Sequence, residues 1–312
     1  HLAQSPVHTV SLFGIRGLCC KTTFPIRHQL FTKTQLPLST TLVFAASTLT
    51  KFGINILTNL KIAILVVAYN AEDTLLKVLD RIPADFVQNI SVVLVCDDAS
   101  TDATHEQALE YQQCSNLPLN IVRHAVNLGY GGNQKYGYLW AIENGMDIVV
   151  LLHGDGQYAP EEIPQMVEPI LSNTADVVFG SRMMQRSKAI KGGMPLYKFI
   201  GNVCLTSIQN LLTGVHLSEW HTGYRAYRVD SLRSASFENN SNYFDFDTQI
   251  ILQMIDARQR ITELQIPTFY GDEISRVNSI KYGLQILGHT INYAKRRAHK
   301  TMRRLYGGRG GI

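Results

Sequence analysis

A pair of side-chain oxygens that could hold a metal ion stands just after an apolar run. The run covers residues 147–152, and Asp155 and Gln157 follow it on a turn that contains Gly154 and Gly156. Because alternate side chains of an extended segment point the same way, the carboxylate and the amide can face one ligand. Hard oxygen ligands suit Mg²⁺ or Mn²⁺, with a diphosphate completing the coordination. The alternative is an acidic turn in which Asp155 only caps the helix that follows.

The elements that must position this turn alternate between strands and helices from Lys61 onward. Buried strands are predicted over residues 62–68, 90–96, 119–123, 147–152 and 175–179. Helices are predicted over residues 72–81 and 100–113, after Gly129 and from Pro160. This alternation is typical of an α/β fold with a mostly parallel central sheet and helices on both faces. Ligands of such sheets bind at the carboxyl ends of the strands, so polar residues should gather there.

Polar clusters do follow all five predicted strands. They are Tyr69–Asn70 with Glu72, Asp97–Asp102, Asn127–Asn133, the Asp155 turn and Gly180–Arg182. Of Asp97 and Asp98, one is expected to cap a helix and the other to accept a hydrogen bond from a base or a ribose. The glycines at 129, 131 and 132 would let backbone amides at a helix N-terminus face an anion, although a plain tight turn explains them equally well.

These clusters, in this order, resemble the motifs of family 2 glycosyltransferases, and in particular those of the dolichyl- and polyprenyl-phosphate sugar synthases. The resemblance extends over about residues 61–282. It implies a GT-A fold, the α/β sandwich that binds nucleotide-diphosphate sugars, with a metal held by Asp155 and Gln157. It also implies that the nucleotide sugar is bound by Ala68, Tyr69, Asn70, Glu72, Asp97, Asp98, Gly129, Gly132, His153 and Gly154.

The chain departs from the family pattern at two positions. His153 stands where the family's Asp-x-Asp-x-Gln motif has its first aspartate. An imidazole suits Mn²⁺ better than Mg²⁺, and it could instead hydrogen-bond a phosphate or a ribose. Val67 replaces a proline, a change that we expect to be structurally harmless.

The segment after the fifth strand is expected to serve the acceptor. Residues 183–194 are polar and basic and resemble a mobile acceptor loop, although an ordinary exposed loop has the same composition. A helix is predicted over residues 195–212, with a core face made of Leu196, Phe199, Ile200, Val203 and Leu211. By resemblance, the lipid phosphate would be cradled by Arg182, Lys198 and Asn202.

Residues 219–227 resemble a further motif of the synthase subgroup. The resemblance places Arg225 and His221 beside the diphosphate or the acceptor phosphate, where they would add positive potential. Glu219 would shape the sugar pocket or, for a hydroxyl acceptor, act as the general base. The candidate catalytic residues are therefore Asp155, Glu219, His221 and Arg225.

The predicted function is inverting, metal-dependent transfer of a sugar from a nucleotide-diphosphate donor to a polyprenyl phosphate. Two alternatives stay open. The first is transfer to a sugar hydroxyl during synthesis of a cell-surface polysaccharide. The second is binding of a nucleotide sugar without catalysis, which the histidine at position 153 motivates.

Composition sets expectations for the beginning of the chain. The 312 residues are 45% hydrophobic, enough for one large core, which we expect in a catalytic domain over residues 61–276. No Asp or Glu precedes Glu72, and no methionine precedes Met146. Residues 1–60 are therefore predicted to be an unstructured or artefactual leader, with a transit-type leader or a weak membrane segment as alternatives.

Residues 277–312 are predicted to form a basic amphipathic helix and tail. Apolar residues recur at helical spacing, while Lys and Arg crowd the last turns. This helix would either pack on the domain with a solvated basic tip or contact a membrane surface, and nucleic-acid binding is not expected. Five cysteines without metal or disulfide spacing favour a reducing compartment. We expect a cytoplasmic protein that could lie peripherally on the inner face of the membrane.

Overall fold

The computed structural model describes residues 60–268 and 279–306 of the chain. The predicted leader over residues 1–60 lies outside the described residues apart from Leu60, so it stays a prediction. Residues 269–276 of the predicted catalytic domain and residues 307–312 of the predicted tail also lie outside them.

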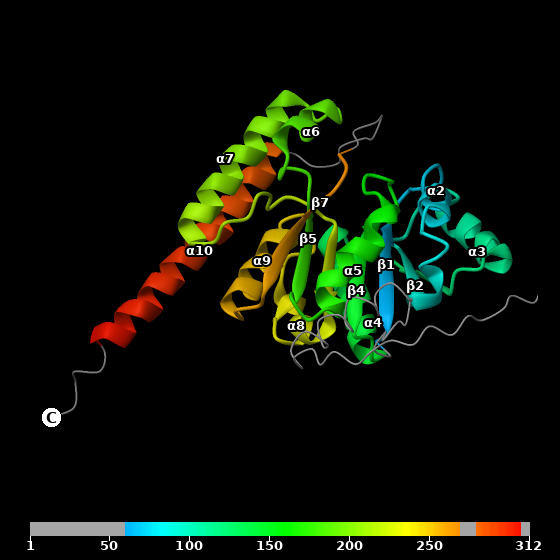
Figure 1. The fold of residues 1–312 in the computed structure, drawn as a ribbon, viewed down its shortest axis with the longest axis horizontal. Helices are drawn as coiled ribbons and strands as arrows, with labels where there is room; N and C mark the ends of the chain where they lie inside the picture. Colours follow the sequence, from blue (N-terminus) through cyan, green and yellow to red (C-terminus); the bar gives the residue numbers. More distant parts are fainter. Residues whose placement is uncertain (1–59, 269–278, 307–312) are drawn as a thin grey trace, which may run out of the picture. The chain divides into compact units, whose positions relative to one another are not determined.

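The centre of the fold is a seven-stranded sheet with the strand order β3-β2-β1-β4-β6-β5-β7 (Figure 1). β6 pairs antiparallel with β4 and β5, and all other neighbours pair parallel. The mostly parallel sheet predicted from the sequence is therefore confirmed. The strands are β1 Ile62–Ala68, β2 Ile90–Asp97, β3 Leu119–Arg123, β4 Ile148–His153, β5 Val177–Ser181, β6 Arg225–Arg228 and β7 Ile261–Gln265.

Helices cover both faces of this sheet, as predicted. The α-helices are α2 Leu75–Asp80, α3 Thr104–Cys114, α4 Tyr130–Glu143, α5 Ile163–Leu171, α6 Arg186–Lys191, α7 Leu196–Thr213, α8 Val229–Arg233, α9 Phe246–Asp256 and α10 Ser279–Tyr306. Short 3-10 turns are η2 Val87–Asn89, η3 Pro160–Glu162 and η4 Phe237–Asn239. Alternate residues of a strand point to opposite faces, and β1 shows this directly. Ile62, Ile64 and Val66 pack with α2, α3 and α5, while Ala63 and Leu65 pack with α4, α8 and α9.

All five predicted strands form, each within two residues of its predicted bounds. The sequence did not predict β6 and β7. β6 has only four residues, with arginines at both ends, and β7 includes Glu263, so neither presents a long apolar run. Both become strands because they complete the sheet beside β5. The local hydrophobic pattern therefore predicted the other five strands but missed β6 and β7, which form only through pairing with their neighbours in the sheet.

Helices α7 and α10, here called the helix pair, lie side by side (Figure 1). The prediction of an apolar core face on α7 is wrong. Leu196 and Leu211 are 65% and 82% exposed, while the buried positions are Asn202, Thr206, Gln209 and Thr213. The polar side faces inward because hydrogen-bond partners lie there. One of them is Thr290 of α10, whose hydroxyl accepts a hydrogen bond from Gln209 Nε2 at 3.4 Å. Only Phe199 and Val203 of the predicted face are partly buried, against a small cluster around α6.

Candidate active site

The candidate site lies where the carboxyl ends of β1, β2, β4 and β5 meet the start of β6. Backbone hydrogen bonds join these ends: Gly154 N–H donates to Val67 O, and Gly180 N–H to Tyr224 O, each at 2.9 Å. Because β6 runs antiparallel to its neighbours, the segment before it enters the sheet at this same edge. The polar clusters after β4 and β5 therefore meet residues 219–225 here, through Tyr158 with Gly223 and Arg182 with Glu219.

Two residues predicted to bind the nucleoside join the loops after β1 and β2. Asn70 Oδ1 accepts a hydrogen bond from the Thr101 backbone N–H at 2.9 Å. Glu72 Oε2 accepts one from the Ala103 N–H at 2.9 Å, at the start of α3. These bonds stabilise the loops, while the neighbouring Tyr69 ring is 40% exposed. Of this group, Tyr69 and Glu72 are exposed and can meet a ligand from solvent.

Asp98 supports the loop that precedes α4. Its Oδ1 and Oδ2 accept hydrogen bonds from the backbone N–H groups of Leu128 and Gly129, at 2.7 and 3.0 Å. Its own N–H donates to Ala68 O, at the buried end of β1. Burial raises the pKa of Asp98, although those two hydrogen bonds oppose the rise. Asp98 therefore holds the loop before α4, but neither α3 nor α4 has a side-chain cap, so the prediction that one of the two aspartates caps a helix is wrong.

Asp97 has one carboxylate oxygen that accepts no hydrogen bond from the described residues. Its Oδ1 accepts hydrogen bonds from the Ser100 N–H, at 3.1 Å, and from the Ser100 hydroxyl. Its Oδ2 is buried without a hydrogen-bond partner among the described residues, with Arg123 Nε at 3.5 Å as an ion-pair partner. A buried acceptor without a hydrogen bond is costly, so it is suited to a donor group of a ligand. This is the aspartate that could accept a hydrogen bond from a base or ribose.

The glycines at the start of α4 pack against protein and do not face an anion, which corrects the prediction for Gly129 and Gly132. Gly129 has φ +80°, and a Cβ there would lie 2.6 Å from Asn242 O. The Gly131 and Gly132 N–H groups donate to this same carbonyl, at 2.8 and 3.3 Å. The segment before α9 thus occupies the N-terminus of α4.

The Asp155–Gln157 turn extends from the end of β4. Asp155 is exposed, and its Oδ1 accepts a hydrogen bond from the Gln157 N–H at 3.0 Å. The remaining carboxylate oxygen and the amide oxygen of Gln157 are hard ligands that suit a divalent cation. The described part of the chain contains no group of three or more His, Cys, Asp or Glu side chains that could hold a metal by itself. The donor set therefore fits a cation only if a diphosphate completes the coordination.

His153, which replaces the family's first aspartate, belongs to a buried chain of polar groups. Its Nε2 lies 3.2 Å from the Tyr130 hydroxyl, which donates to Asp247 Oδ2 at 3.0 Å. Burial lowers the pKa of His153, although the negative charges of Asp155 and Asp247 oppose this. The ring is therefore neutral near pH 7, and Tyr130 fixes its orientation. A Cβ on Gly223 would lie only 2.5 Å from the ring, so the histidine fills this space closely.

Arg225 is a structural residue, which corrects its predicted contact with a phosphate. The side chain is fully buried and forms an ion pair with Asp247 at 3.2 Å. Its Nε and Nη2 donate to the Thr222 carbonyl at 3.0 and 2.7 Å, and its guanidinium lies over the Phe179 ring. All of these partners are protein groups, so Arg225 holds the start of β6 and the start of α9 together.

Glu219 is likewise not placed to act as a base, which corrects that one of its two predicted roles. The carboxylate is fully buried and accepts hydrogen bonds from Arg182 N–H at 2.7 Å, from Arg182 Nε at 3.1 Å and from Asn202 Nδ2 at 2.9 Å. Burial alone would raise its pKa, but the Arg182 guanidinium holds the pKa below its ordinary value. Arg182 and Asn202, two of the three residues predicted to bind the acceptor phosphate, therefore lie close together, but both bind the Glu219 carboxylate. The third, Lys198, lies one turn earlier on α7 and is half-buried.

His221 is neutral, which corrects its predicted positive potential. Burial lowers the pKa of His221 to about 4. Its Nδ1 lies 3.1 Å from the hydroxyl of Tyr282 on α10, and its Nε2 is buried without a hydrogen-bond partner among the described residues. A neutral imidazole with an open ring nitrogen can still donate to, or accept a hydrogen bond from, a ligand.

Sequence reasoning missed the residues that complete these contacts. The Tyr158 ring makes an edge-to-face contact with His153, and its hydroxyl accepts a hydrogen bond from the Gly223 N–H at 2.7 Å. Tyr130, Asp247 and Tyr282 come from three different helices. Tyr130 and Tyr158 stand inside the recognised clusters, whereas Asp247 looks like an ordinary acid at a helix start. Only tertiary contact reveals their partners.

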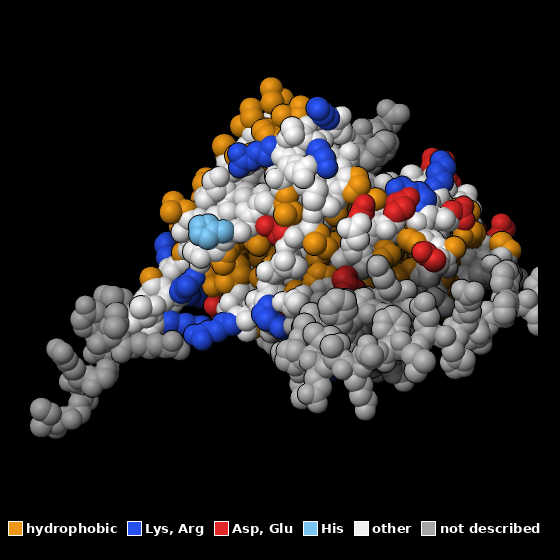
Figure 2. Space-filling view, in the orientation of Figure 1, with side chains coloured by type: hydrophobic (Ala, Val, Ile, Leu, Met, Phe, Trp, Pro, Cys, Tyr) orange, Lys and Arg blue, Asp and Glu red, His pale blue; other side chains and the backbone are white. Residues whose placement is uncertain are grey.

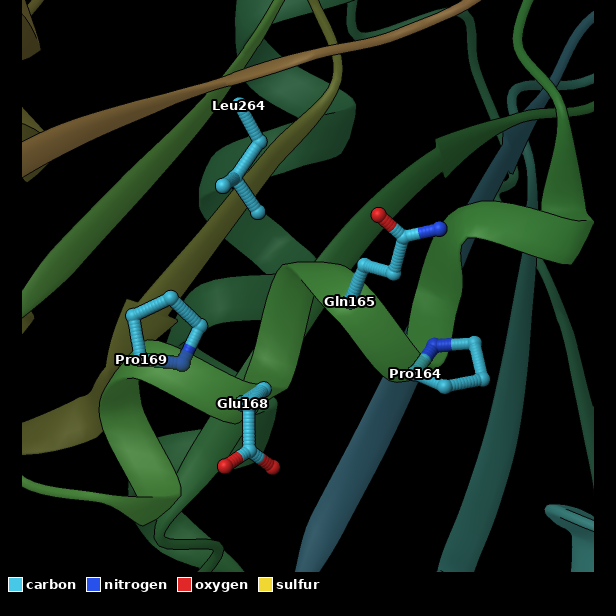
Figure 3. Close-up of a pocket in the computed structure, with 5 residues that line it drawn as sticks. All are labelled: Pro164, Gln165, Glu168, Pro169 and Leu264. Carbon is cyan, nitrogen blue, oxygen red and sulfur yellow. The ribbon is translucent and has the colours of Figure 1, made fainter.

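A surface hollow of about 390 Å³ lies away from this site, on α5 and β7. Figure 3 shows its lining, with the Glu168 carboxylate pointing away from Leu264. The lining contains none of the predicted site residues. The remaining side chains are Pro164, Gln165 and Pro169, a set without nucleophile, cation or metal ligand cluster. This hollow carries no chemistry, and the edge of the sheet stays the candidate site.

The family model described as glycosyl transferase family 2 matches residues 63–235, which include the ends of β1, β2, β4 and β5 and the start of β6 that form the site. The chain belongs to glycosyl transferase family 2. This confirms the family predicted from the clusters, and with it the prediction of an enzyme that transfers sugars. None of the helices in the described ranges, 60–268 and 279–306, is both long and apolar enough to span a bilayer.

Curated relatives of this family 2 chain cover most of its length. A UDP-N-acetylglucosamine–dolichyl-phosphate N-acetylglucosaminyltransferase of Methanococcus voltae is 28% identical, over 72% of this chain and 92% of the relative. An undecaprenyl-phosphate mannosyltransferase of Micrococcus luteus is 29% identical, over 69% of this chain and 86% of the relative.

Solved structures support the fold. Glucosyl-3-phosphoglycerate synthase from Mycobacterium tuberculosis in complex with UDP has a TM-score of 0.58 at 16% identity, over 85% of this chain and 87% of that one. The same synthase with Mn²⁺ and UDP-glucose has a TM-score of 0.57 at 17% identity, over 76% and 80%. The GT-A fold predicted from the sequence is therefore confirmed.

Proposed function

We propose that this chain transfers a sugar from a nucleotide-diphosphate donor to a polyprenyl phosphate, with inversion at the anomeric carbon. The observation that carries the proposal is the edge of the sheet at which β4 ends in the Asp155–Gln157 turn and β2, on the other side of β1, ends in the buried Asp97. Two different needs of a nucleotide-sugar donor are met there. A cation binding the diphosphate requires hard oxygens, and a base or ribose requires a carboxylate acceptor.

Asp155 and Gln157 would hold a Mg²⁺ or Mn²⁺ ion. When bound, such an ion neutralises the charge that grows on the departing nucleoside diphosphate. His153 would sit beside it as a neutral ring, fixed by Tyr130 and able to offer its second nitrogen. Because imidazole is a better ligand for Mn²⁺ than for Mg²⁺, we expect Mn²⁺ to be preferred. Asp97 would bind the nucleoside through Oδ2, since its other oxygen is occupied by Ser100.

The structural role of Glu219 favours a polyprenyl phosphate over a sugar hydroxyl as the acceptor. A sugar hydroxyl needs a general base to remove its proton, and Glu219 is instead committed to Arg182 and Asn202. A polyprenyl phosphate is already anionic and needs no base. The two curated relatives described above act on dolichyl phosphate or undecaprenyl phosphate by name, which supports this acceptor class. Lys198, on the helix that also supplies Asn202, is the cation that we assign to the acceptor phosphate.

The proposal places the enzyme at the cytoplasmic face of a membrane, in the assembly of cell-envelope or other surface glycans. The lipid acceptor is held in the bilayer, so the protein must reach it from the surface. Three cysteines of the described part, Cys96, Cys114 and Cys204, are free thiols, which agrees with a reducing compartment.

Transfer of radiolabelled sugar to short polyprenyl phosphates tests the proposal. Label should enter the lipid when a panel of UDP- and GDP-sugars is offered with Mn²⁺. Asp155→Ala should reduce transfer by about a hundredfold or more, because a charge-stabilising ion is lost. Asp85→Ala, at an exposed carboxylate outside the site, should leave the rate unchanged.

Other outcomes of this assay select the alternatives. Turnover only with oligosaccharide acceptors would replace the lipid by a sugar hydroxyl. Tight nucleotide-sugar binding in isothermal titration without turnover on any acceptor would favour a non-catalytic binding protein. In the same titration Asp97→Asn should weaken nucleotide binding by about tenfold, since a charge-assisted hydrogen bond becomes a neutral one.

A further inference from the structure

The helix pair shows its apolar residues to solvent on both helices. Tyr197 and Ile208 of α7 are 66% and 41% exposed, and Ile280 and Leu284 of α10 are 79% and 68% exposed. At 100° per residue, the exposed apolar residues of α7 fall within an arc of about 120°, opposite its buried polar positions. Soluble helices bury such an arc, so an apolar surface of this extent marks a place of interaction.

The two arcs adjoin because the helices run in the same direction. Three contacts join α7 to α10: Leu205 with Gly283, Gln209 with Thr290, and the Thr213 carbonyl with Arg297. Later residues of α7 contact later residues of α10, so the two helices are parallel. With these residues in contact, the helical-wheel positions put Tyr197 and Ile208 of α7 on the same side as Ile280 and Leu284 of α10. The arcs therefore form one surface, here called the outer face.

Positive charge borders the outer face, and negative charge is missing from its elements. Residues 183–213 contain four Lys or Arg and residues 279–306 contain seven, while neither segment contains any of the chain's Asp or Glu residues. Figure 2 shows Lys or Arg side chains around the apolar end of the molecule formed by α6 and the start of α7. Further along α10, a hollow of about 470 Å³ is lined by Lys295, Arg296, His299 and Lys300.

We propose that the outer face binds the surface of an anionic lipid bilayer, with its apolar side chains among the lipid and its cations at the headgroups. This pattern of apolar arc and basic border is typical of helices that lie in a membrane interface. A second copy of this chain fits less well, because two acid-free basic surfaces would repel each other. A bilayer rich in anionic lipid satisfies both the apolar and the positive part of the face.

The outer face is connected to the candidate site, so this inference deepens the proposed function and rests on it for its purpose. α7 supplies Asn202, which donates to Glu219, and α10 supplies Tyr282, which meets His221. The helices that would lie on the lipid thus also contact the predicted acceptor side. Docking would bring that side to the depth at which the phosphate of a membrane lipid is found.

Vesicle flotation of the whole chain tests the docking. The protein should bind phosphatidylcholine vesicles that contain phosphatidylglycerol, and bind pure phosphatidylcholine more weakly. The triple variant Tyr197→Ser, Ile208→Ser, Leu284→Ser should lose about tenfold or more in vesicle affinity, because it lacks apolar groups that would enter the lipid. The matched control Leu109→Ser with Val126→Ser changes exposed apolar residues elsewhere and should bind as the unaltered chain does.

A second measurement does not depend on the triple variant folding. Tryptophan fluorescence of Ile208→Trp should shift to shorter wavelength when the anionic vesicles are added, and that of Val126→Trp should not. Absence of vesicle binding by the unaltered chain, or equal binding by the triple variant, would overturn the proposal. So would a dimer of the unaltered chain that the triple variant converts to a monomer in sedimentation, because the face would then join two copies.

The choice of acceptor separates this inference from the proposed function. The triple variant should transfer sugar to a short, water-soluble polyprenyl phosphate at the unaltered rate, and lose transfer to an acceptor embedded in vesicles. If no variant transfers sugar to any acceptor but vesicle binding follows the expected pattern, the proposed reaction fails and the docking surface stands.

Discussion

The sheet and the helix pair obey opposite relations between hydrophobic pattern and burial. In β4, the apolar run is buried along its whole length. In α7, the apolar arc is exposed and the polar residues Asn202, Thr206, Gln209 and Thr213 are buried. A strand in the middle of a sheet is covered on both faces, so all of its apolar side chains are buried. A helix at the border of a domain can turn either side inward, and the partners on the domain decide which.

The largest expected effect concerns the buried ion pair between the two regions. Glu219→Ala leaves Arg182 buried without its carboxylate, and we expect a loss of about 3–5 kcal/mol in the free energy of unfolding. Urea denaturation measures it. The control is Glu161→Ala, whose partner Arg81 is exposed, and it should cost less than about 1 kcal/mol. Similar losses for the two variants would contradict the structural role assigned to Glu219.

A pair of leucines tests the inverted burial directly. Leu152→Ala in β4 creates a cavity in the core and should cost about 2–5 kcal/mol. Leu211→Ala in α7, at an 82% exposed side chain, should change stability by less than about 0.5 kcal/mol. The same denaturation experiment applies to both. A large loss for Leu211→Ala would mean that the apolar arc of α7 is covered in the folded chain, and the contrast between the regions would disappear.

The substitution His153→Asp tests how the sheet edge selects its metal. It restores the carboxylate of the family pattern, so the preference for Mn²⁺ over Mg²⁺ should fall by about tenfold. Electron paramagnetic resonance of Mn²⁺, with Mg²⁺ as competitor and UDP present, measures binding without catalysis. His216→Asp, at an exposed position, is the matched control. An unchanged preference would place His153 outside the coordination of the metal.

The smallest expected effect is a pH dependence at the contact between the site and α10. The pKa of His221 is lowered by burial to about 4, below the unfolded value of about 6.5. The unfolded chain therefore binds more protons between these values, and stability falls as the pH drops through this window. Replacing His221 by Asn should flatten the fall in urea midpoint between pH 6.5 and 4. Replacement of the exposed His216 should leave the slope as it is.

The sequence predicted positions in the site better than roles. The sequence predicts that one of Asp97 and Asp98 caps a helix, but neither does, and Asp98 instead holds the loop of Leu128 and Gly129. Arg225 and Glu219 lie where the motif places them, but each forms an ion pair within the protein, Arg225 with Asp247 and Glu219 with Arg182. A motif shows that a charged residue is required at a position. It does not show whether the charge serves a ligand or the protein.

The sequence alone determined the family, the alternation of strands and helices, and the edge at which polar residues gather. These properties depend on local pattern and on the order of motifs along the chain, which are visible without coordinates. Tertiary structure alone decided the insertion of β6, the partners of the buried charges and the side that α7 turns outward. Each of these depends on groups distant in sequence, such as Glu219 with Asn202, because desolvation makes a buried polar group take whichever partner the fold brings near.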